Sequence, residues 1–217
     1  YGPDIEKNSI VNYLAVNPRF KSSSIERKWG ENGVLKLIYV SVFYPHKDPL
    51  TLAEATKILN LRGLTSKTHI TMEPDDFEPW PNCEGELEQL QSMEYSQFLT
   101  LGRVEHNELN EVLKRFDIFV FPSLAETFGF PMLEAMRAGV PLIVSDIPIH
   151  REICGEAALY FELGNSESLA DKITELNENE DLREQLICDG RARAENQFTW
   201  ERHVMQLSRT IKELLNP

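Results

Sequence analysis

The sequence is short of basic residues. It carries 22 lysines and arginines against 35 aspartates and glutamates, which gives a formal net charge of -13 over 217 residues. The acids gather in residues 73–94 and 176–185, and no basic stripe offsets them. Because nucleic-acid binding needs clustered Lys and Arg to neutralise phosphates, we expect no nucleic-acid partner. A single anionic ligand, held by backbone amides and one or two bases, remains compatible with this charge.

Cysteines and long apolar runs are also scarce. The three cysteines, Cys83, Cys154 and Cys188, have no close-paired spacing, which favours free thiols in a reducing compartment over a structural zinc site. No apolar run approaches the roughly 18 residues that would span a bilayer. The first residues show no signal peptide, so we expect a cytoplasmic protein. The chain does not begin with Met, and we therefore expect it to be a piece of a longer protein.

Apolar, β-branched segments alternate with helical patterns along the chain. Six segments are typical of strands: residues 34–43, 67–72, 97–102, 117–123, 141–146 and 158–163. Strands that alternate with helices indicate βαβ units and a parallel sheet. The sequence therefore predicts an α/β fold, a Rossmann-like parallel sheet of about six strands with helices on both faces.

The first 30 residues are less regular. Residues 11–16 are compatible with a strand and residues 17–24 with a loop, so we expect residues 1–30 to be a linker that leads into a domain over residues 31–217. Within that domain, Asn107 is a candidate N-cap for a helix over 106–116.

Two glutamates stand eight positions apart in "FPSLAETFGFPMLEAMRAGVP", residues 121–141. The preceding strand ends near Ser123, so Glu126 lies in a loop at the carboxyl edge of the sheet, where open parallel sheets bind ligands. Glu134 lies about one turn into the next helix, where a carboxylate can reach a diol such as ribose.

The turn between the two glutamates suits a phosphate. Gly129 has no side chain to exclude a ligand from the backbone, and the helix after it presents unpaired N–H groups and the positive end of its dipole. Pro131 suits the first helical turn and cannot donate. The amides available to a phosphate are therefore those of Gly129, Phe130 and Met132.

These residues resemble the E-x7-E motif of glycosyltransferase family 4, a family of retaining, nucleotide-sugar-dependent enzymes with two Rossmann-like domains. The resemblance covers roughly residues 34–215. It implies one half of a two-domain glycosyltransferase B-type architecture, namely the C-terminal, donor-binding domain. The blocks that carry it are "YVSVFYPHKDPLTLAEA", "LGRVEHNELNEVLKRFDIFVFPS", "EAMRAGVPLIVSDIPIHREICGEAALYFELGNSESLADKI" and "QFTWERHVMQLSRTI".

The resemblance implies roles for individual residues. Glu126 would contact hydroxyls of the donor sugar, and Glu134 would bind the ribose hydroxyls. Lys47 matches the lysine that neutralises the leaving diphosphate, which is electrostatic stabilisation where charge develops. Backbone amides would wrap the sugar and the phosphates at Thr127, Phe128, Gly129 and Phe130.

Two further positions follow from the same resemblance. Arg103 and Val104 lie where the family places the nucleobase. The chain departs from the family at Ser41-Val42, where family members usually have Gly-Arg, so the arginine that partners Lys47 is absent. His46 or Arg103 could partly substitute for it.

The resemblance implies transfer of a sugar from a nucleotide diphosphate sugar to a hydroxyl acceptor, without a metal ion or other cofactor. The pathway would be bacterial polysaccharide or glycolipid synthesis. A saccharide or lipid-linked acceptor would bind an N-terminal domain outside these residues, which could also touch the inner face of the membrane. We expect the 217 residues alone to bind nucleotide but to have little transferase activity.

Two alternatives remain open at this point. One is a nucleotide-sugar epimerase or a phosphorylase of the same architecture. An epimerase would need further acid and base residues, for which His150 and Glu152 are the nearest candidates. The other is a catalytically inactive nucleotide-binding module, which the loss of the arginine at Val42 favours and the intact glutamate pair opposes.

Overall fold

The structure is a computed structural model that describes residues 9–21, 28–92 and 94–215. It contains one six-stranded sheet, whose strands are all parallel and lie in the order β3-β2-β1-β4-β5-β6. The strands are β1 Leu35–Tyr39, β2 Ser66–Ile70, β3 Leu99–Leu101, β4 Ile118–Phe121, β5 Leu142–Ser145 and β6 Ala158–Phe161. This is the predicted Rossmann-like sheet.

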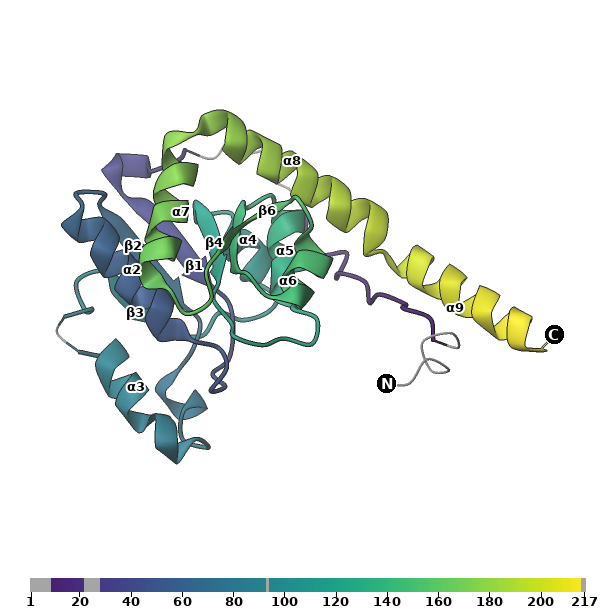
Figure 1. Ribbon diagram of the computed structural model, residues 1–217, viewed down its shortest axis with the longest axis horizontal. Helices are drawn as coiled ribbons and strands as arrows, with labels where there is room; N and C mark the ends of the chain where they lie inside the picture. Colours follow the sequence, from purple (N-terminus) through teal and green to yellow (C-terminus); the bar gives the residue numbers. More distant parts are fainter. Residues whose placement is uncertain (1–8, 22–27, 93, 216–217) are drawn as a thin grey trace.

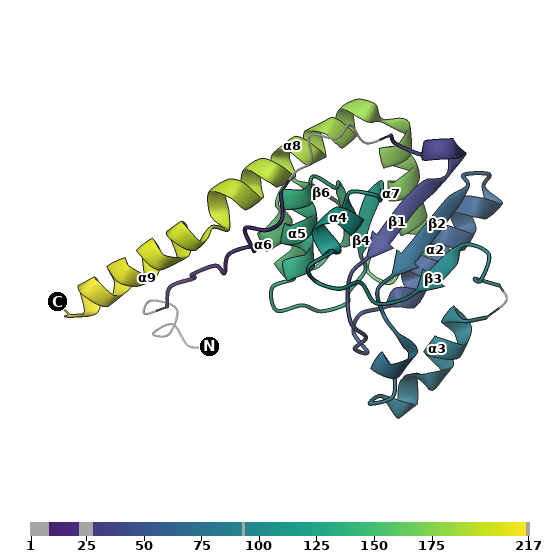
Figure 2. The same cartoon turned by 180° about the vertical axis from the view of Figure 1, so that it is seen from behind.

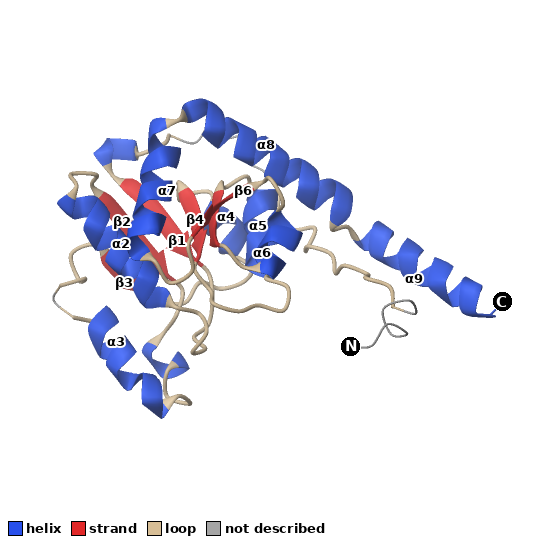
Figure 3. Cartoon of the chain, viewed as in Figure 1, coloured by secondary structure: helices blue, strands red, loops and turns tan. Residues whose placement is uncertain are grey.

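Helices follow the strands and cover both faces of the sheet (Figures 1 and 3). The α-helices are α2 Pro49–Leu61, α3 Glu84–Leu90, α4 Leu109–Leu113, α5 Phe130–Ala138, α6 Pro148–Cys154, α7 Ser166–Glu178, α8 Glu180–Gln197 and α9 Trp200–Leu215. Short 3-10 helices are η1 Glu31–Gly33, η2 Pro74–Asp76 and η3 Pro81–Cys83. Helices α2 and α7 pack together on one face, whereas α4 and α5 lie on the other, where α8 covers α5 (Figure 2).

The core forms where the central strands are buried from both sides. Every residue of β4 and β5 is buried, which explains why these strands are apolar, except for Ser145 at the end of β5, instead of alternating with polar residues. Helix α5 begins after Gly129 and ends at Ala138, and its C-cap Gly139 has a positive φ of 73°. The predicted helix limits near Pro131 and Gly139 are confirmed, because both depend on local backbone chemistry.

Three local predictions differ from the structure. Residues 11–16 form no strand. Asn107 is not the N-cap of α4, because that helix begins at Leu109 after Glu108 and has no side-chain cap. The strand over 34–43 is also shorter than predicted, since residues 40–43 already belong to the loop after β1. For residues 11–16 and 34–43 the hydrophobic pattern identified the segment but tertiary contacts set its conformation, whereas the Asn107 prediction rested on the capping preference of asparagine alone.

The described part of the predicted linker lies against the domain. Val16 and Phe20 are buried in the core, and the Val16 amide donates to Phe198 O at 3.0 Å. The Nδ2 group of Asn12 donates to His203 O at 3.2 Å, so residues 9–21 lie beside the junction of α8 and α9 (Figure 2). Residues 1–8 and 22–27 of the predicted linker lie outside the described residues.

The position of the ligand site follows from the strand order. From β1 the chain moves outward through β2 and β3, then returns to β4 on the other side of β1. The loops after β1 and β4, residues 40–48 and 122–129, therefore leave the sheet at the same edge and diverge. In doubly wound sheets this switch point is where ligands bind.

Candidate functional site

Hydrogen bonds join the two loops at the switch point. The hydroxyl of Tyr39, the last residue of β1, donates to Lys47 O at 2.9 Å and lies 3.2 Å from Ser123 Oγ. The Leu124 amide donates to His46 O at 2.7 Å. These bonds hold the loop that carries Lys47 against the loop that carries Glu126.

Lys47 and Glu126 form an ion pair in this crevice. Lys47 Nζ lies 2.5 Å from Glu126 Oε1, and the side chains are only 11% and 8% exposed. The ammonium also lies 5.5 Å from the centroid of the Phe121 ring, which attracts cations through its electron-rich face. The structure thus brings together two predicted site residues that are 79 positions apart in the sequence.

The turn before α5 has a conformation that favours glycine. Gly129 has a φ of 85°, in the left-handed region, and a Cβ there would lie 2.4 Å from Met132 Cε. The amides of Gly129 and Phe130 have no hydrogen-bond partner among the residues that the structure describes, so both can bind an anion. Met132 differs from the expectation, since its amide already donates to Gly129 O at 3.0 Å.

Glu134 lies in a groove beside the start of α5. Its Oε1 is 3.3 Å from Nε2 of His106, and its side chain is only 9% exposed. Burial raises the pKa of Glu134, while the neighbouring His106 opposes this shift. The groove has a volume of about 610 Å³ and is lined by Ala15, Asn17, Pro18, Val40, His106, Leu109, Phe130, Pro131, Glu134 and Trp200.

The remaining predicted positions lie around this edge with different surroundings. Arg103 is half exposed, and its Nη2 lies 3.1 Å from Asp76 Oδ1 and 3.5 Å from Glu73 Oε2. These acidic partners occupy Arg103, so it does not replace the arginine missing at Val42 in this structure. Val42 itself is 48% exposed.

Side chains of the α5 turn are partly committed to packing. Phe128 lies 5.0 Å from Phe130 and 6.1 Å from Phe198, measured between ring centroids.

Three other predicted site residues have no charged partner in the described structure. They are exposed Thr127, half-buried Val104, and His46, whose ring stacks on that of Tyr44 with 5.7 Å between the ring centroids.

The two candidate acid and base residues of α6, His150 and Glu152, lie in different surroundings. Glu152 accepts a hydrogen bond from Tyr13 at 2.9 Å and therefore turns toward residues 9–21. His150 is fully buried, and burial lowers its pKa, while the charges of Glu126 and Lys47 act on it in opposite senses. Only His150 therefore belongs to the surroundings of the switch point.

A family model described as glycosyl transferases group 1 matches residues 22–193. The chain belongs to this family. Among curated relatives of this group 1 glycosyltransferase chain is the O-antigen chain mannosyltransferase RfbU of Salmonella typhimurium, which is 31% identical over 193 residues. That match covers 82% of the chain but 49% of the Salmonella protein, so the chain spans about half the length of this relative.

Solved structures show the same fold at lower identity. Sucrose-phosphate synthase from Thermosynechococcus elongatus superposes with a TM-score of 0.76 at 20% identity, over 93% of this chain and 51% of that one. The Anabaena protein HepE, solved in complex with UDP and glucose, has a TM-score of 0.70 at 16% identity, over 83% of this chain and 48% of that one. The group 1 chain thus has the fold of one half of these glycosyltransferase B-type proteins.

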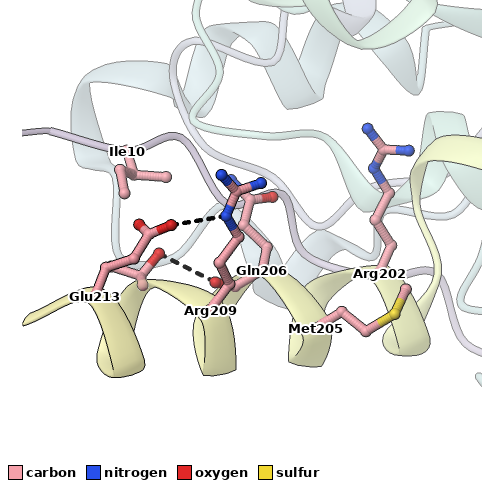
Figure 4. Close-up of a pocket in the computed structure, with 7 residues that line it drawn as sticks. Ile10, Arg202, Met205, Gln206, Arg209 and Glu213 are labelled. Atoms are coloured by element: carbon pink, nitrogen blue, oxygen red, sulfur yellow. Dashed lines mark hydrogen bonds and ion pairs between the residues drawn. The ribbon is translucent and has the colours of Figure 1, made fainter. Parts of the chain in front are cut away.

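A second cavity of the group 1 chain lies away from the switch point, between α9 and Ile10 (Figure 4). It has a volume of about 570 Å³, and Arg209 Nε within it is 2.8 Å from Glu213 Oε1.

In the described residues, no group of three or more His, Cys, Asp or Glu side chains could hold a metal ion. None of the described helices is long and apolar enough to cross a membrane.

Sequence reasoning missed one residue of the group 1 site. His106 was expected to lie only near the start of a helix, yet it contacts Glu134 from the loop between β3 and α4. The available signal was the position of His106, two residues after Val104 in the predicted nucleobase segment. Loops after neighbouring parallel strands end at the same edge of the sheet, so a polar residue there can reach the α5 groove.

Proposed function

We propose that this chain is the donor-binding half of a retaining glycosyltransferase that uses a nucleotide diphosphate sugar. The observation that carries the proposal is the arrangement of Lys47, Glu126 and Glu134 around the start of α5 at the switch point of the sheet. A cation and unpaired amides suit a diphosphate, and a carboxylate on either side suits the hydroxyls of a sugar ring. The Anabaena neighbour solved with UDP and glucose supports this class of ligand.

Binding of the donor would rearrange the ion pair. The diphosphate would compete with Glu126 for Lys47, and Glu126 would then be free to accept hydrogen bonds from hydroxyls of the donor sugar. Glu134 would exchange its contact with His106 for the ribose hydroxyls. The nucleobase and diphosphate ends of the donor would be lined by Arg103, Val104 and His46. The donor sugar would be approached by the backbone of Thr127 and Phe128.

The chemical step would develop negative charge on the leaving diphosphate. Lys47 and the amides of Gly129 and Phe130 would stabilise that charge, which is the role of preorganised donors in many enzymes. The acceptor oxygen would replace the diphosphate oxygen at the anomeric carbon on the same face, and its proton would pass to the diphosphate. With these cationic and amide groups in place, we infer that no metal ion is required.

The names of the relatives indicate the acceptor class. An O-antigen chain mannosyltransferase extends a polysaccharide, so we infer a hexosyltransferase with a saccharide or lipid-linked acceptor. The acceptor would bind the part of a longer protein that this chain does not cover, and that part would supply any peripheral membrane contact. We infer a cytoplasmic location, at the inner face of the membrane where the acceptor is lipid-linked.

A second candidate is a nucleotide-binding module without catalysis. The observation that favours it is Val42, an exposed apolar side chain where family members usually have an arginine. Replacing Val42 by Arg should tighten diphosphate binding by about tenfold, because one added charge-assisted hydrogen bond contributes roughly 1.5 kcal/mol. Sugar transfer by the full-length protein, with Val42 in place, would exclude the module.

Titration calorimetry tests the donor assignment. The chain is titrated with UDP, GDP and ADP and with their hexose conjugates, and we expect one nucleotide series to bind. Glu134→Ala should weaken that binding by about 100-fold, because two charge-assisted hydrogen bonds to ribose are lost.

The matched control is Glu184→Ala, which removes an exposed helical glutamate on α8 and should leave nucleotide affinity unchanged. Equal affinity of the wild-type chain and Glu134→Ala would refute the ribose assignment. Failure of every nucleotide to bind would refute the proposed function as a whole.

A further inference from the structure

A chain of buried polar residues lies beneath the Lys47–Glu126 pair. It consists of Tyr39 at the end of β1, Ser123 after β4, Ser145 at the end of β5 and His150 in α6. All four residues are completely inaccessible to solvent. Buried polar groups are costly unless they are hydrogen-bonded, so their clustering under the candidate site requires an explanation.

Hydrogen bonds connect this chain to both loops of the site. Ser145 Oγ donates to Ser123 O at 2.5 Å, and it lies 3.1 Å from His150 Nδ1. Ser123 Oγ in turn lies 3.2 Å from the hydroxyl of Tyr39, which donates to Lys47 O. Helix α6 is thereby linked to Ser123, in the loop that carries Glu126, and to the backbone of Lys47.

The hydrogen bonds also settle which nitrogen of His150 carries the proton. Nδ1 is 2.8 Å from the carbonyl oxygen of Ser145, which can only accept, so Nδ1 is the protonated nitrogen. Nε2 is then an acceptor, and it is buried without a hydrogen-bond partner in the described residues. An unpaired buried acceptor costs about 1–3 kcal/mol, which marks His150 as unusual for a residue that only packs.

His150 is also close to the ion pair. Its ring centroid is 5.5 Å from that of Phe121, and Lys47 Nζ lies 5.5 Å from the same Phe121 centroid. The charged groups that act on the imidazole are Glu126 and Lys47. Protonation of His150 would place a second buried cation near Lys47, and the imidazolium would compete with Lys47 for Glu126.

We propose that His150 is a positioning residue of the donor site: its neutral, Nδ1-protonated ring fixes Ser145 and Ser123, and so holds the loop that presents Glu126 to the sugar. The ring must stay uncharged for Lys47 to serve the diphosphate. Burial keeps it neutral by lowering its pKa. This inference rests on the proposed function but concerns a residue that makes no contact with the donor.

The test uses the full-length transferase and the variants His150→Leu and His150→Asn. The leucine side chain has no N–H to donate to the carbonyl oxygen of Ser145. The asparagine side-chain amide can place an N–H near the position of Nδ1, but it cannot take up a proton as histidine does. We expect His150→Leu to lower kcat by about 10- to 100-fold with little change in donor KM. His150→Asn should recover much of kcat.

The pH profile separates positioning from a merely structural role. Wild-type kcat should decrease as the pH is lowered and the His150 imidazole becomes charged. In His150→Asn this decrease of kcat at acid pH, the acid limb of the pH profile, should be absent. The matched control His69→Asn changes a half-buried histidine on β2, away from this network, and should keep the limb. An unchanged acid limb in His150→Asn, or wild-type kcat in His150→Leu, would overturn the proposal.

A spectroscopic measurement is independent of catalysis. Ring ¹⁵N shifts of His150 in the 217-residue chain should show a protonated Nδ1 and an unprotonated Nε2, and the ring should become charged only at a lower pH than a free histidine, because burial lowers its pKa. The opposite tautomer, or a ring that titrates like a free histidine, would overturn the proposal. Nucleotide binding by the same sample shows separately whether the proposed function holds.

Discussion

Replacing Lys47 by Met should destabilise the folded chain more than replacing Lys47 and Glu126 together. Both side chains are about one-tenth exposed and lie 2.5 Å apart. Removal of one partner leaves the other charge buried and unpaired, which typically costs 3–5 kcal/mol. We take the lower end, about 3 kcal/mol, because the pair lies at the mouth of a crevice and water can reach a freed carboxylate.

The expected values form a double-mutant cycle. Lys47→Met should lower the free energy of unfolding by about 3 kcal/mol and Glu126→Gln by about 2 kcal/mol. The double variant has no buried charge and should lie within about 1 kcal/mol of wild type, so the coupling energy is at least about 4 kcal/mol. For a chain of this size, a loss of 3 kcal/mol corresponds to a Tm lower by about 6–12 °C.

Urea unfolding followed by tryptophan fluorescence measures the cycle in the absence of ligand. The control is the same cycle on Lys172 and Glu175, which lie 2.7 Å apart but are 35% and 45% exposed. That surface pair should show a coupling below about 0.5 kcal/mol. Additive effects of Lys47→Met and Glu126→Gln would refute the view that the buried pair is coupled.

Three further predictions concern the same edge of the sheet. Gly129→Ala should lose about 1–2 kcal/mol of stability to urea, because alanine is strained at a φ of 85° and its Cβ would meet Met132 Cε; wild-type stability would contradict this. Glu86 has a pKa raised to about 7 by burial and then by Asp48, so it costs stability as the pH rises from about 4.5 toward 7. Glu86→Gln should therefore gain about 1 kcal/mol at pH 8, an amount discounted for its half exposure, and nothing at pH 4; a gain of the same size at both values would exclude this cause. Burial raises the pKa of Glu134, so nucleotide affinity measured by calorimetry should fall as the pH is lowered, and Glu134→Gln should flatten the dependence.

The elements and their order were predictable because their signals are local. A strand buried on both faces is apolar almost throughout, as β4 is and as β5 is up to Ser145, and a helix ends where glycine takes a positive φ, as at Gly139. The placement of Glu126 in a loop and of Glu134 one turn into α5 follows from the same signals. Local pattern failed at residues 11–16, whose conformation is set by contacts with Phe198 and α9.

The sequence by itself determined the alternation of strands and helices, the turn at Gly129 and the presence of an acid on each side of it. Only the tertiary structure decided which distant residues meet there. Lys47 pairs with Glu126, Glu134 with His106, and Arg103 with Asp76. The physical reason is that these contacts depend on the order of strands in the sheet. That order brings the ends of β1 and β4 together, although about 80 residues separate them in the chain.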